Sequence, residues 1–483
     1  MLRALLGLVP RKRSAGSPRV VHRTARCGLR VTRAQRERVF GLLRAAGDVW
    51  CAVLDVNRWR RQRGGKPVVG YQDLCAELTA AGPGTFGELD VSGARSVLRR
   101  YSDSWFSALK RRAEGDSAAR FPRRKRGLVP VRWYCGRFVL EGRRLRIPVA
   151  RGCAPLEVRL DRDPPFPPDQ IRSVTFGCAD DGKLYADFTA EVPVAVYLEG
   201  EGPDPSRVAG VDPGVIHPYA VTGPDGQGLL VSGRAIRAEN YQHLKDSKAR
   251  SRANARRAPK PGQRGSRRWK KHRQRQQKAE ARHQRRVRQA RQEAAKDVVD
   301  WAVQQQVGTL VIGDPRGVLD HDAGPVHNKR TRDWSPGQLI SVLSDKAEAA
   351  GIKVEIVNER GTSSTCPDCL RRVPKPVGRT FTCPHCGLAG HRDLVGAANI
   401  AARGSGGGRP LPLPGERGMT HRRAGRHLPG VHPARRDPRR RPSPRRPRQG
   451  HLAGTGPPCA PPRGTQEVAR GHARRSEAVA DDP

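Results

Sequence analysis

The hydrophobic positions in the first quarter of the chain follow a helical period. Apolar residues recur at intervals of three and four over residues 32–57, 72–78 and 96–114, with polar residues between them. This spacing places the apolar side chains on one face of an α-helix, so each stretch is predicted to be an amphipathic helix. A helical bundle is therefore expected over residues 30–118.

From residue 121 to residue 193 the pattern changes to short runs that are rich in β-branched and aromatic residues. Glycine and proline separate these runs, as is typical of strands in an all-β unit. We expect a small β-barrel or curved sheet over residues 119–200, which completes an N-terminal lobe over residues 30–200. The runs cover residues 128–134, 137–140, 145–149, 171–176 and 184–190.

A second pattern begins after residue 205, where predicted strands come first and then alternate with helices. Three strands in a meander, a long basic helix, and then strand, helix and strand indicate a mixed sheet flanked by helices. An α/β domain is therefore expected from residue 206 to residue 403. In order, these segments cover residues 208–211, 219–222, 229–232, 243–296, 309–312, 337–350 and 352–357.

The two ends of the chain show neither period. Residues 404–483 contain 14 Pro, 13 Gly and 17 Arg but no Lys. A segment of this composition buries too little apolar surface to offset the entropy of ordering it. We expect a flexible leader over residues 1–29 and a disordered basic tail over residues 404–483, so the fold class is multidomain α+β.

Charge narrows the possible partners. Lys and Arg total 92 against 46 Asp and Glu, a formal net charge of +46. Self-repulsion at this charge opposes compaction unless a polyanion neutralises it, and this favours nucleic acid over an anionic membrane surface or a small metabolite. No run of about 18 apolar residues and no signal-peptide cleavage site are seen. A cytoplasmic, nucleoid-associated protein without a membrane segment or small-molecule cofactor is expected.

Two basic segments also carry an aromatic residue, a combination that suits a phosphate backbone and a stacked base. The first follows Phe121 and the second lies within the basic stretch 243–296, which holds 21 Lys and Arg and three acidic residues. The predicted nucleic-acid-binding residues are Arg123, Arg124 and Lys125 in the first segment and Arg267, Arg268, Trp269, Lys270 and Lys271 in the second.

Four of the eleven cysteines form a metal-binding pattern. Cys366 and Cys369 are followed, after thirteen residues, by Cys383 and Cys386, whereas the other seven are scattered singly. Two such pairs supply four thiolates to a tetrahedral Zn²⁺ and leave no position for water. The sequence predicts a structural zinc ribbon over residues 362–388, which zinc binding helps to fold.

Several carboxylates are candidates for a catalytic centre. Asp212 ends the first strand of the mixed sheet, although Asp-Pro-Gly alone also marks a turn. Asp393 begins a predicted helix, where an N-cap role would explain it equally well. A third acid is either Asp314 or Glu359, because each follows a predicted strand at the sheet edge where catalytic groups are expected.

As an ordered set, these motifs resemble the RuvC-type nuclease domain of TnpB proteins, the OrfB-type transposases of insertion sequences. This family is related to type V CRISPR effectors and to the Fanzor proteins. The resemblance is close over residues 206–403 and holds only in outline over residues 30–200. It is carried by Gly210-Val-Asp212-Pro-Gly214, Ile312-Gly-Asp314, Thr362-Ser-Ser-Thr-Cys366, His391-Arg-Asp393 and Ala397-Ala-Asn399-Ile400.

The resemblance implies an RNase H-like fold in which Asp212, a middle acid and Asp393 hold two Mg²⁺ ions. Most relatives have glutamate where this chain has Asp314. Some bacterial members and the Fanzor proteins have this glutamate further downstream, as Glu359 would be here. Since neighbouring strands lie about 4.8 Å apart, a side chain from the adjacent strand end reaches the same metal. Glu359 is the preferred third acid and Asp314 the alternative.

The resemblance also implies a guide RNA and a DNA target, because members of the family cut DNA under RNA guidance. The expected function is an RNA-guided, Mg²⁺-dependent DNA endonuclease with a structural Zn²⁺. One alternative is a catalytically inactive relative that binds DNA or regulates it. The other is a true DNA transposase that joins strands itself.

Overall fold

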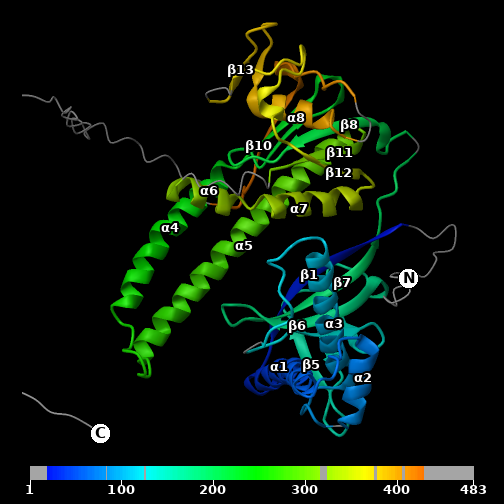
Figure 1. The fold of residues 1–483 in the computed structure, drawn as a ribbon, viewed down its shortest axis with the longest axis vertical. Helices are drawn as coiled ribbons and strands as arrows, with labels where there is room; N and C mark the ends of the chain where they lie inside the picture. Colours follow the sequence, from blue (N-terminus) through cyan, green and yellow to red (C-terminus); the bar gives the residue numbers. More distant parts are fainter. Residues whose placement is uncertain are drawn as a thin grey trace, which may run out of the picture. The chain divides into compact units, whose positions relative to one another are not determined.

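The structure is a computed structural model that describes residues 19–82, 84–124, 127–198, 200–315, 324–374, 378–404 and 408–428. Its α-helices and strands group into an N-terminal lobe, an α/β domain and a two-stranded ribbon (Figure 1). Among the residues described, no helix is both long and apolar enough to cross a membrane.

The N-terminal lobe is built on an antiparallel sheet of seven strands in the order β2-β6-β7-β1-β5-β4-β3. No pairing joins β2 to β3 within the described chain, so the expected small barrel is instead an open sheet. The strands are β1 (Val20–Arg30), β2 (Val131–Tyr134), β3 (Val139–Glu141), β4 (Arg144–Ile147), β5 (Leu156–Leu160), β6 (Ile171–Cys178) and β7 (Leu184–Pro193).

The first of these strands corrects the expected leader. Residues 20–29, predicted to be flexible, belong to β1, which lies between β7 and β5 in the middle of the sheet. Pairing to both neighbours runs through the backbone, so a strand forms there although Cys27 is its one fully buried side chain. Residues 1–18 lie outside the described part of the chain.

Three helices pack with this sheet, α1 (Arg33–Gln62), α2 (Tyr71–Ala80) and α3 (Val91–Ala113). A capping box between Thr32 and Gln35 begins α1, because each side chain accepts a hydrogen bond from the backbone of the other. The ring of Trp50 on α1 meets that of Tyr101 on α3 edge to face, with centroids 5.2 Å apart. Both rings are buried in the core of the lobe, together with β-strand residues such as Phe188.

The α/β domain has a six-stranded mixed sheet in the order β12-β11-β8-β9-β10-β15. Strand β11 runs parallel to β8 and β12, whereas β9 is antiparallel to both β8 and β10. The strands are β8 (Asp204–Asp212), β9 (Tyr219–Thr222), β10 (Gly228–Ser232), β11 (Val307–Asp314), β12 (Lys353–Asn358) and β15 (Met419–Arg423).

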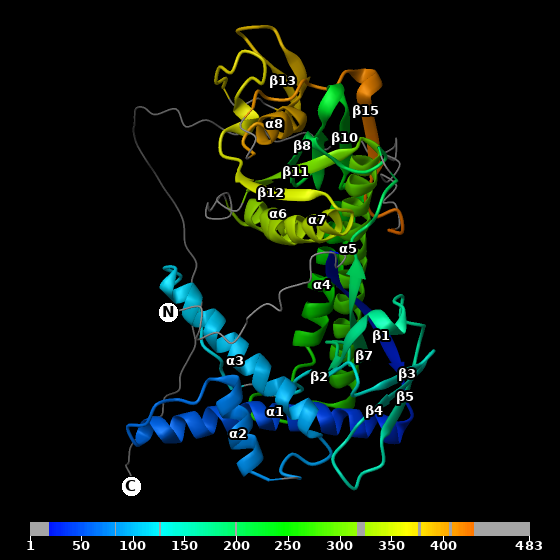
Figure 2. The same cartoon turned by 90° about the vertical axis from the view of Figure 1, so that its right-hand side faces the viewer.

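Helices cover both faces of this sheet (Figures 1 and 2). One face packs on α5 (Arg267–Gln304) and α7 (Pro336–Ala349), in a core that includes Val211 and Ile312. The other face packs on α8 (Arg392–Ala401), which approaches β8 so closely that a side chain on Gly210 would collide with the Ala397 carbonyl oxygen. The remaining helices are α4 (Arg234–Ala255) and α6 (Pro325–Trp334), and the ribbon strands are β13 (Thr380–Thr382) and β14 (Ala389–His391).

Two further expectations are corrected in this domain. The long basic helix expected over residues 243–296 is two antiparallel helices, α4 and α5, because the prolines and glycines of residues 258–265 interrupt the helical period. Residues 419–423, expected in a disordered tail, form β15, which pairs in parallel with β10. Ala424 and Leu428 are buried in the same core. Residues 429–483 lie outside the described chain.

Candidate metal centres

The three preferred acids meet beside α8. Asp212 is the last residue of β8, Glu359 directly follows β12, and Asp393 is the second residue of α8. Because β8, β11 and β12 are parallel neighbours, their carboxyl ends lie at one edge of the sheet. A Cβ built on Gly396, one helical turn after Asp393, would lie 2.7 Å from Asp212 Oδ2. Asp212 therefore reaches α8 at the turn that Asp393 begins.

Alternation along the strands separates Glu359 from Asp314. A Cβ on Gly313 would lie 2.7 Å from both Glu359 Oε2 and Ile400 Cδ1, so Glu359 lies over Gly313 on the α8 face. Ile312 lies in the core on the opposite face. Because successive strand residues point to opposite faces, alternation predicts that Asp314, the last residue of β11, points away from α8, although its charge still acts on Glu359.

Burial and mutual repulsion shift the protonation of these acids. Burial, followed by the charges of Glu359 and Asp393, raises the pKa of Asp212 well above its usual value. Burial, followed by the charge of Asp314, raises the pKa of Glu359 from 4.5 to about 7. Glu359 Oε2 is buried and has no hydrogen-bond partner among the residues that the structure describes. Both groups are therefore suited to a site where cations compensate the carboxylate charge.

Asp393 has a different environment. His217 Nδ1 lies 2.9 Å from Asp393 Oδ2. One guanidinium nitrogen of Arg379 donates hydrogen bonds to the two carboxylate oxygens of Asp393, at 2.7 and 2.9 Å. The backbone N–H of Asp393 donates to His391 Nδ1, which caps α8. Burial alone would raise the pKa of Asp393, but the His217 hydrogen bond and the Arg379 charge outweigh it and lower the pKa.

Sequence reasoning missed His217 and Arg379. His217 lies in the tight turn after β8, where the Gly214 N–H donates to its carbonyl oxygen at 2.9 Å. Arg379 lies between the two cysteine pairs, directly before β13. Neither position stands out by periodicity or spacing, because the role of each residue depends on its contact with Asp393, which is distant in the sequence.

The four predicted zinc ligands converge in the ribbon. The sulfur atoms of Cys366 and Cys386 are 3.5 Å apart, and those of Cys369 and Cys383 are 3.6 Å apart. All four lie within 4.8 Å of one another. In a tetrahedral Zn²⁺ site with bonds of about 2.3 Å, neighbouring sulfurs are separated by roughly 3.8 Å. The cluster therefore fits a structural zinc ion.

The ribbon and α8 share contacts beyond the metal. The side-chain amide of Asn399 donates to the carbonyl oxygens of Thr362 and Thr365, each at 2.8 Å. Val395 of α8 is buried in the same small core as Phe381 and Cys383. The helix that carries Asp393 is thus held from one side by the sheet and from the other by the ribbon.

The predicted nucleic-acid-binding residues lie at two places. Arg124 forms an ion pair with Asp55 at 3.2 Å, and the Arg123 carbonyl oxygen accepts a hydrogen bond from Trp50 Nε1. Lys125 lies outside the described residues. Arg267, Arg268, Trp269, Lys270 and Lys271 form the first turns of α5, where Arg273 lies over the Trp269 ring at 5.0 Å.

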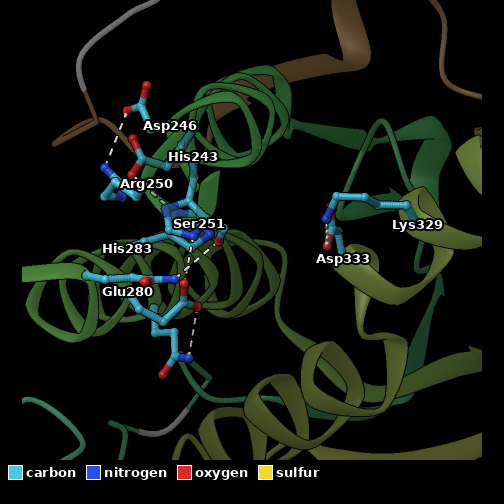
Figure 3. Close-up of polar contacts among 11 residues, drawn as sticks. His243, Asp246, Arg250, Ser251, Glu280, His283, Lys329 and Asp333 are labelled. Atoms are coloured by element: carbon cyan, nitrogen blue, oxygen red, sulfur yellow. Dashed lines mark hydrogen bonds and ion pairs between the residues drawn. The ribbon is translucent and has the colours of Figure 1, made fainter. Parts of the chain in front are cut away.

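Polar contacts join α4 to α5 (Figure 3). The rings of His243 and His283 stack with centroids 3.8 Å apart, and His243 Nε2 lies 2.8 Å from Glu280. His283 Nδ1 lies 3.3 Å from Glu239. Glu239 and Glu280 are two of the few acidic residues of the hairpin, where arginine and lysine are in large excess.

Known proteins match the α/β domain and the ribbon in two adjacent regions. Residues 191–319 match the OrfB_IS605 family, described as a probable transposase, and residues 337–400 match the Cas12f1-like TNB domain. A CRISPR-associated endodeoxyribonuclease Cas12f1 of Sulfoacidibacillus thermotolerans is 28% identical over 109 residues, which are 22% of this chain and 24% of that protein. Cas12f1 of Syntrophomonas palmitatica is 24% identical over 112 residues, 23% of this chain and 22% of that protein.

Both matches span only about a quarter of the length of these curated relatives. A solved Cas12f1-sgRNA-target DNA complex contains a chain of similar fold, with a TM-score of 0.56 at 14% identity, over 77% of this chain and 83% of that one. The chain is thus a multidomain α/β protein with the fold of Cas12-type effectors. Together, the matches confirm the resemblance to the TnpB-like family.

Proposed function

We propose that this chain is an RNA-guided, Mg²⁺-dependent DNA endonuclease of the insertion-sequence type. The observation that carries the proposal is the meeting of Asp212, Glu359 and Asp393 beside one helix, from three distant parts of the sequence. The charges of Glu359 and Asp393 both raise the pKa of Asp212, so the carboxylates repel one another. Their convergence therefore favours a centre built for divalent cations.

Asp212, Glu359 and Asp393 are the residues that would hold Mg²⁺. The donor set fits this ion, because carboxylate oxygens are its preferred protein ligands and Glu359 Oε2 is buried with no hydrogen-bond partner in the described part of the chain. When bound, a pair of Mg²⁺ ions supplies an activated water and stabilises the departing oxygen of a phosphodiester.

The other residues of the centre orient and shield the acids. His217 and Arg379 fix the direction of the Asp393 carboxylate. Gly210 and Gly396 allow α8 to approach β8, so that Asp212 packs against the helix. The ribbon completes this arrangement from the far side of α8, which gives its zinc a structural role.

The proposed partners follow from charge and from the relatives. The α4–α5 hairpin and the segment at Arg123 and Arg124 offer basic surfaces for a phosphate backbone. The solved Cas12f1 protein of similar fold was determined with an sgRNA and target DNA. For this chain we infer a guide RNA and a DNA target, with sequence read by base pairing and the duplex recognised by its backbone.

Sequencing of RNA that co-purifies with the full chain, followed by cleavage of a matching DNA in Mg²⁺, tests the proposal. Asp212→Asn should lower cleavage by at least about a hundredfold, equivalent to about 3 kcal/mol of the activation barrier, without loss of DNA binding. Asp314→Asn is the matched control, because Asp314 points away from α8, and it should retain cleavage.

The same experiment separates the alternatives. Bound RNA and DNA without cleavage by the wild-type chain would identify an inactive binding relative. RNA-independent strand joining at the ends of its own element would identify a true transposase.

A further inference from the structure

Two histidines adjoin Asp393 and form a second group of potential metal ligands, distinct from the four cysteines. One ligand atom each from His217, His391 and Asp393 lies within 4.8 Å of the other two. The imidazole rings meet edge to face, with centroids 5.2 Å apart. The side chains of His217 and Asp393 are only 16% and 11% exposed. The group is therefore a shielded cluster rather than a chance surface gathering.

Local structure holds all three groups in place. His217 is carried by the tight turn after β8, and His391 ends β14 and caps α8, which Asp393 enters one turn before Gly396. Three separate elements thus present two imidazoles and a carboxylate to one point. None of the proposed Mg²⁺ ligands other than Asp393 belongs to this group.

We propose that His217, His391 and Asp393 form a binding site for a transition-metal ion of the zinc class. Two imidazoles and one carboxylate are a ligand set for Zn²⁺ and similar ions with open coordination positions, whereas Mg²⁺ prefers oxygen ligands alone. The inference deepens the proposed nuclease and in that respect rests on it, because Asp393 belongs to both sites.

Metal binding here exchanges contacts that already exist. The Arg379 guanidinium nitrogen, 2.7 and 2.9 Å from the two Asp393 oxygens, gives up at least one of these two hydrogen bonds. The Arg379 side chain is 41% exposed, so it can turn towards solvent. His217 exchanges its 2.9 Å contact with Asp393 Oδ2 for the ion. If His391 ligates through Nδ1, it gives up the 3.2 Å hydrogen bond from the Asp393 backbone.

Sharing of Asp393 has a functional consequence. An ion held by the two histidines withdraws this carboxylate from Asp212 and Glu359. Zn²⁺ bound there should therefore inhibit Mg²⁺-dependent cleavage, and removal of either histidine should relieve the inhibition.

Cobalt is a suitable probe, because it reports its own ligands optically. Full-length protein with zinc already in the ribbon is titrated with Co²⁺ in the absence of Mg²⁺. We expect saturable visible absorption from Co²⁺ bound to nitrogen and oxygen, without the near-ultraviolet charge transfer that thiolate ligands produce. His217→Gln and His391→Asn should each weaken this binding at least about tenfold. Asn at position 391 retains a helix N-cap, so this variant should fold.

His22→Gln is the matched control, because His22 lies on β1 with a side chain that is 65% exposed, and it should bind Co²⁺ like wild type. Equal binding by wild type and both site variants would overturn the proposal, as would thiolate charge transfer alone or the absence of saturable binding. Mg²⁺-dependent cleavage is measured separately without Co²⁺. A chain that cleaves no DNA but binds Co²⁺ through the histidines would refute the nuclease and leave the metal site standing.

Discussion

Replacement of Glu359 by glutamine should stabilise the metal-free protein in a strongly pH-dependent way. Burial raises the pKa of Glu359 from 4.5 to about 7, so the folded state holds this proton more tightly than the unfolded state. The associated stability is fully present below pH 4.5 and is lost as the pH rises through 7. At about 1.4 kcal/mol for each pH unit between the two values, the full loss is about 3 kcal/mol.

Glutamine keeps the shape of the side chain and does not titrate. In the wild-type chain only a small part of this loss has occurred at pH 5, and nearly all of it has occurred at pH 8. The difference in unfolding free energy between Glu359→Gln and wild type should therefore grow by about 2 to 3 kcal/mol from pH 5 to pH 8, in favour of the variant. The substitution also removes the Glu359 charge that raises the pKa of Asp212, and this adds to the difference in the same direction at high pH.

Urea denaturation at the two pH values, in buffer without Mg²⁺, measures this difference. Added Mg²⁺ at pH 8 should stabilise the wild-type chain and have a much smaller effect on the variant, because the ion binds the folded carboxylates. A difference that stays the same at both pH values would refute the burial argument for Glu359. Cleavage that survives Glu359→Gln but is lost in Asp314→Asn would make Asp314 the third acid.

Three further predictions concern the packing around the centre. Gly210→Ala should cost more than about 3 kcal/mol in urea denaturation, because its Cβ meets the backbone of α8, whereas Gly41→Ala, with nothing within 4 Å, should stabilise α1 by up to about 1 kcal/mol. Equal effects would contradict the close approach of α8. Leu428→Ala should cost about 2 to 4 kcal/mol, because Leu428 is only 4% exposed. An unchanged denaturation curve for Leu428→Ala would indicate that this segment is part of the disordered tail. Cys383→Ser should lower the zinc content by one ion per chain and lower the first thermal transition, because the ribbon core includes α8. Unchanged zinc by elemental analysis would exclude the four-cysteine site.

Residues of the candidate site could be predicted from the sequence where a short segment contains the whole pattern. The spacing of Cys366, Cys369, Cys383 and Cys386 encodes two turns that each present two sulfurs, and tertiary structure has only to bring the turns together. Asp212 was locatable because an apolar run ends at it. In each case a short segment contains the whole signal.

The preference for Glu359 over Asp314 depends on the tertiary structure. Both follow predicted strands, so spacing alone leaves them equivalent. What separates them is the direction of Gly313, which faces α8 and thereby directs Asp314 to the other side of the sheet. The helix that favours Glu359 begins nearly eighty residues after Gly313, and the local sequence pattern does not reveal this contact.

Two of the strands missed by pattern reasoning, β1 and β15, share one property. Both β1 and β15 are rich in arginine and other polar residues, and neither shows the alternation of apolar and polar residues that marks a half-buried strand. They are strands because open backbone groups of β5, β7 and β10 pair with them. The formation of β1 and β15 therefore depends on pairing with the neighbouring strands as much as on their own residues.

The late position of β15 bears on how the protein is made. On the ribosome, β10 emerges long before its parallel neighbour, so the nascent chain exposes an unpaired edge while the hairpin, the remaining strands and the ribbon are still being translated. Release of a truncated product before residue 419 would leave that edge permanently open to other strands. Translation to at least this point is therefore a condition for a chain that stays free of aggregates.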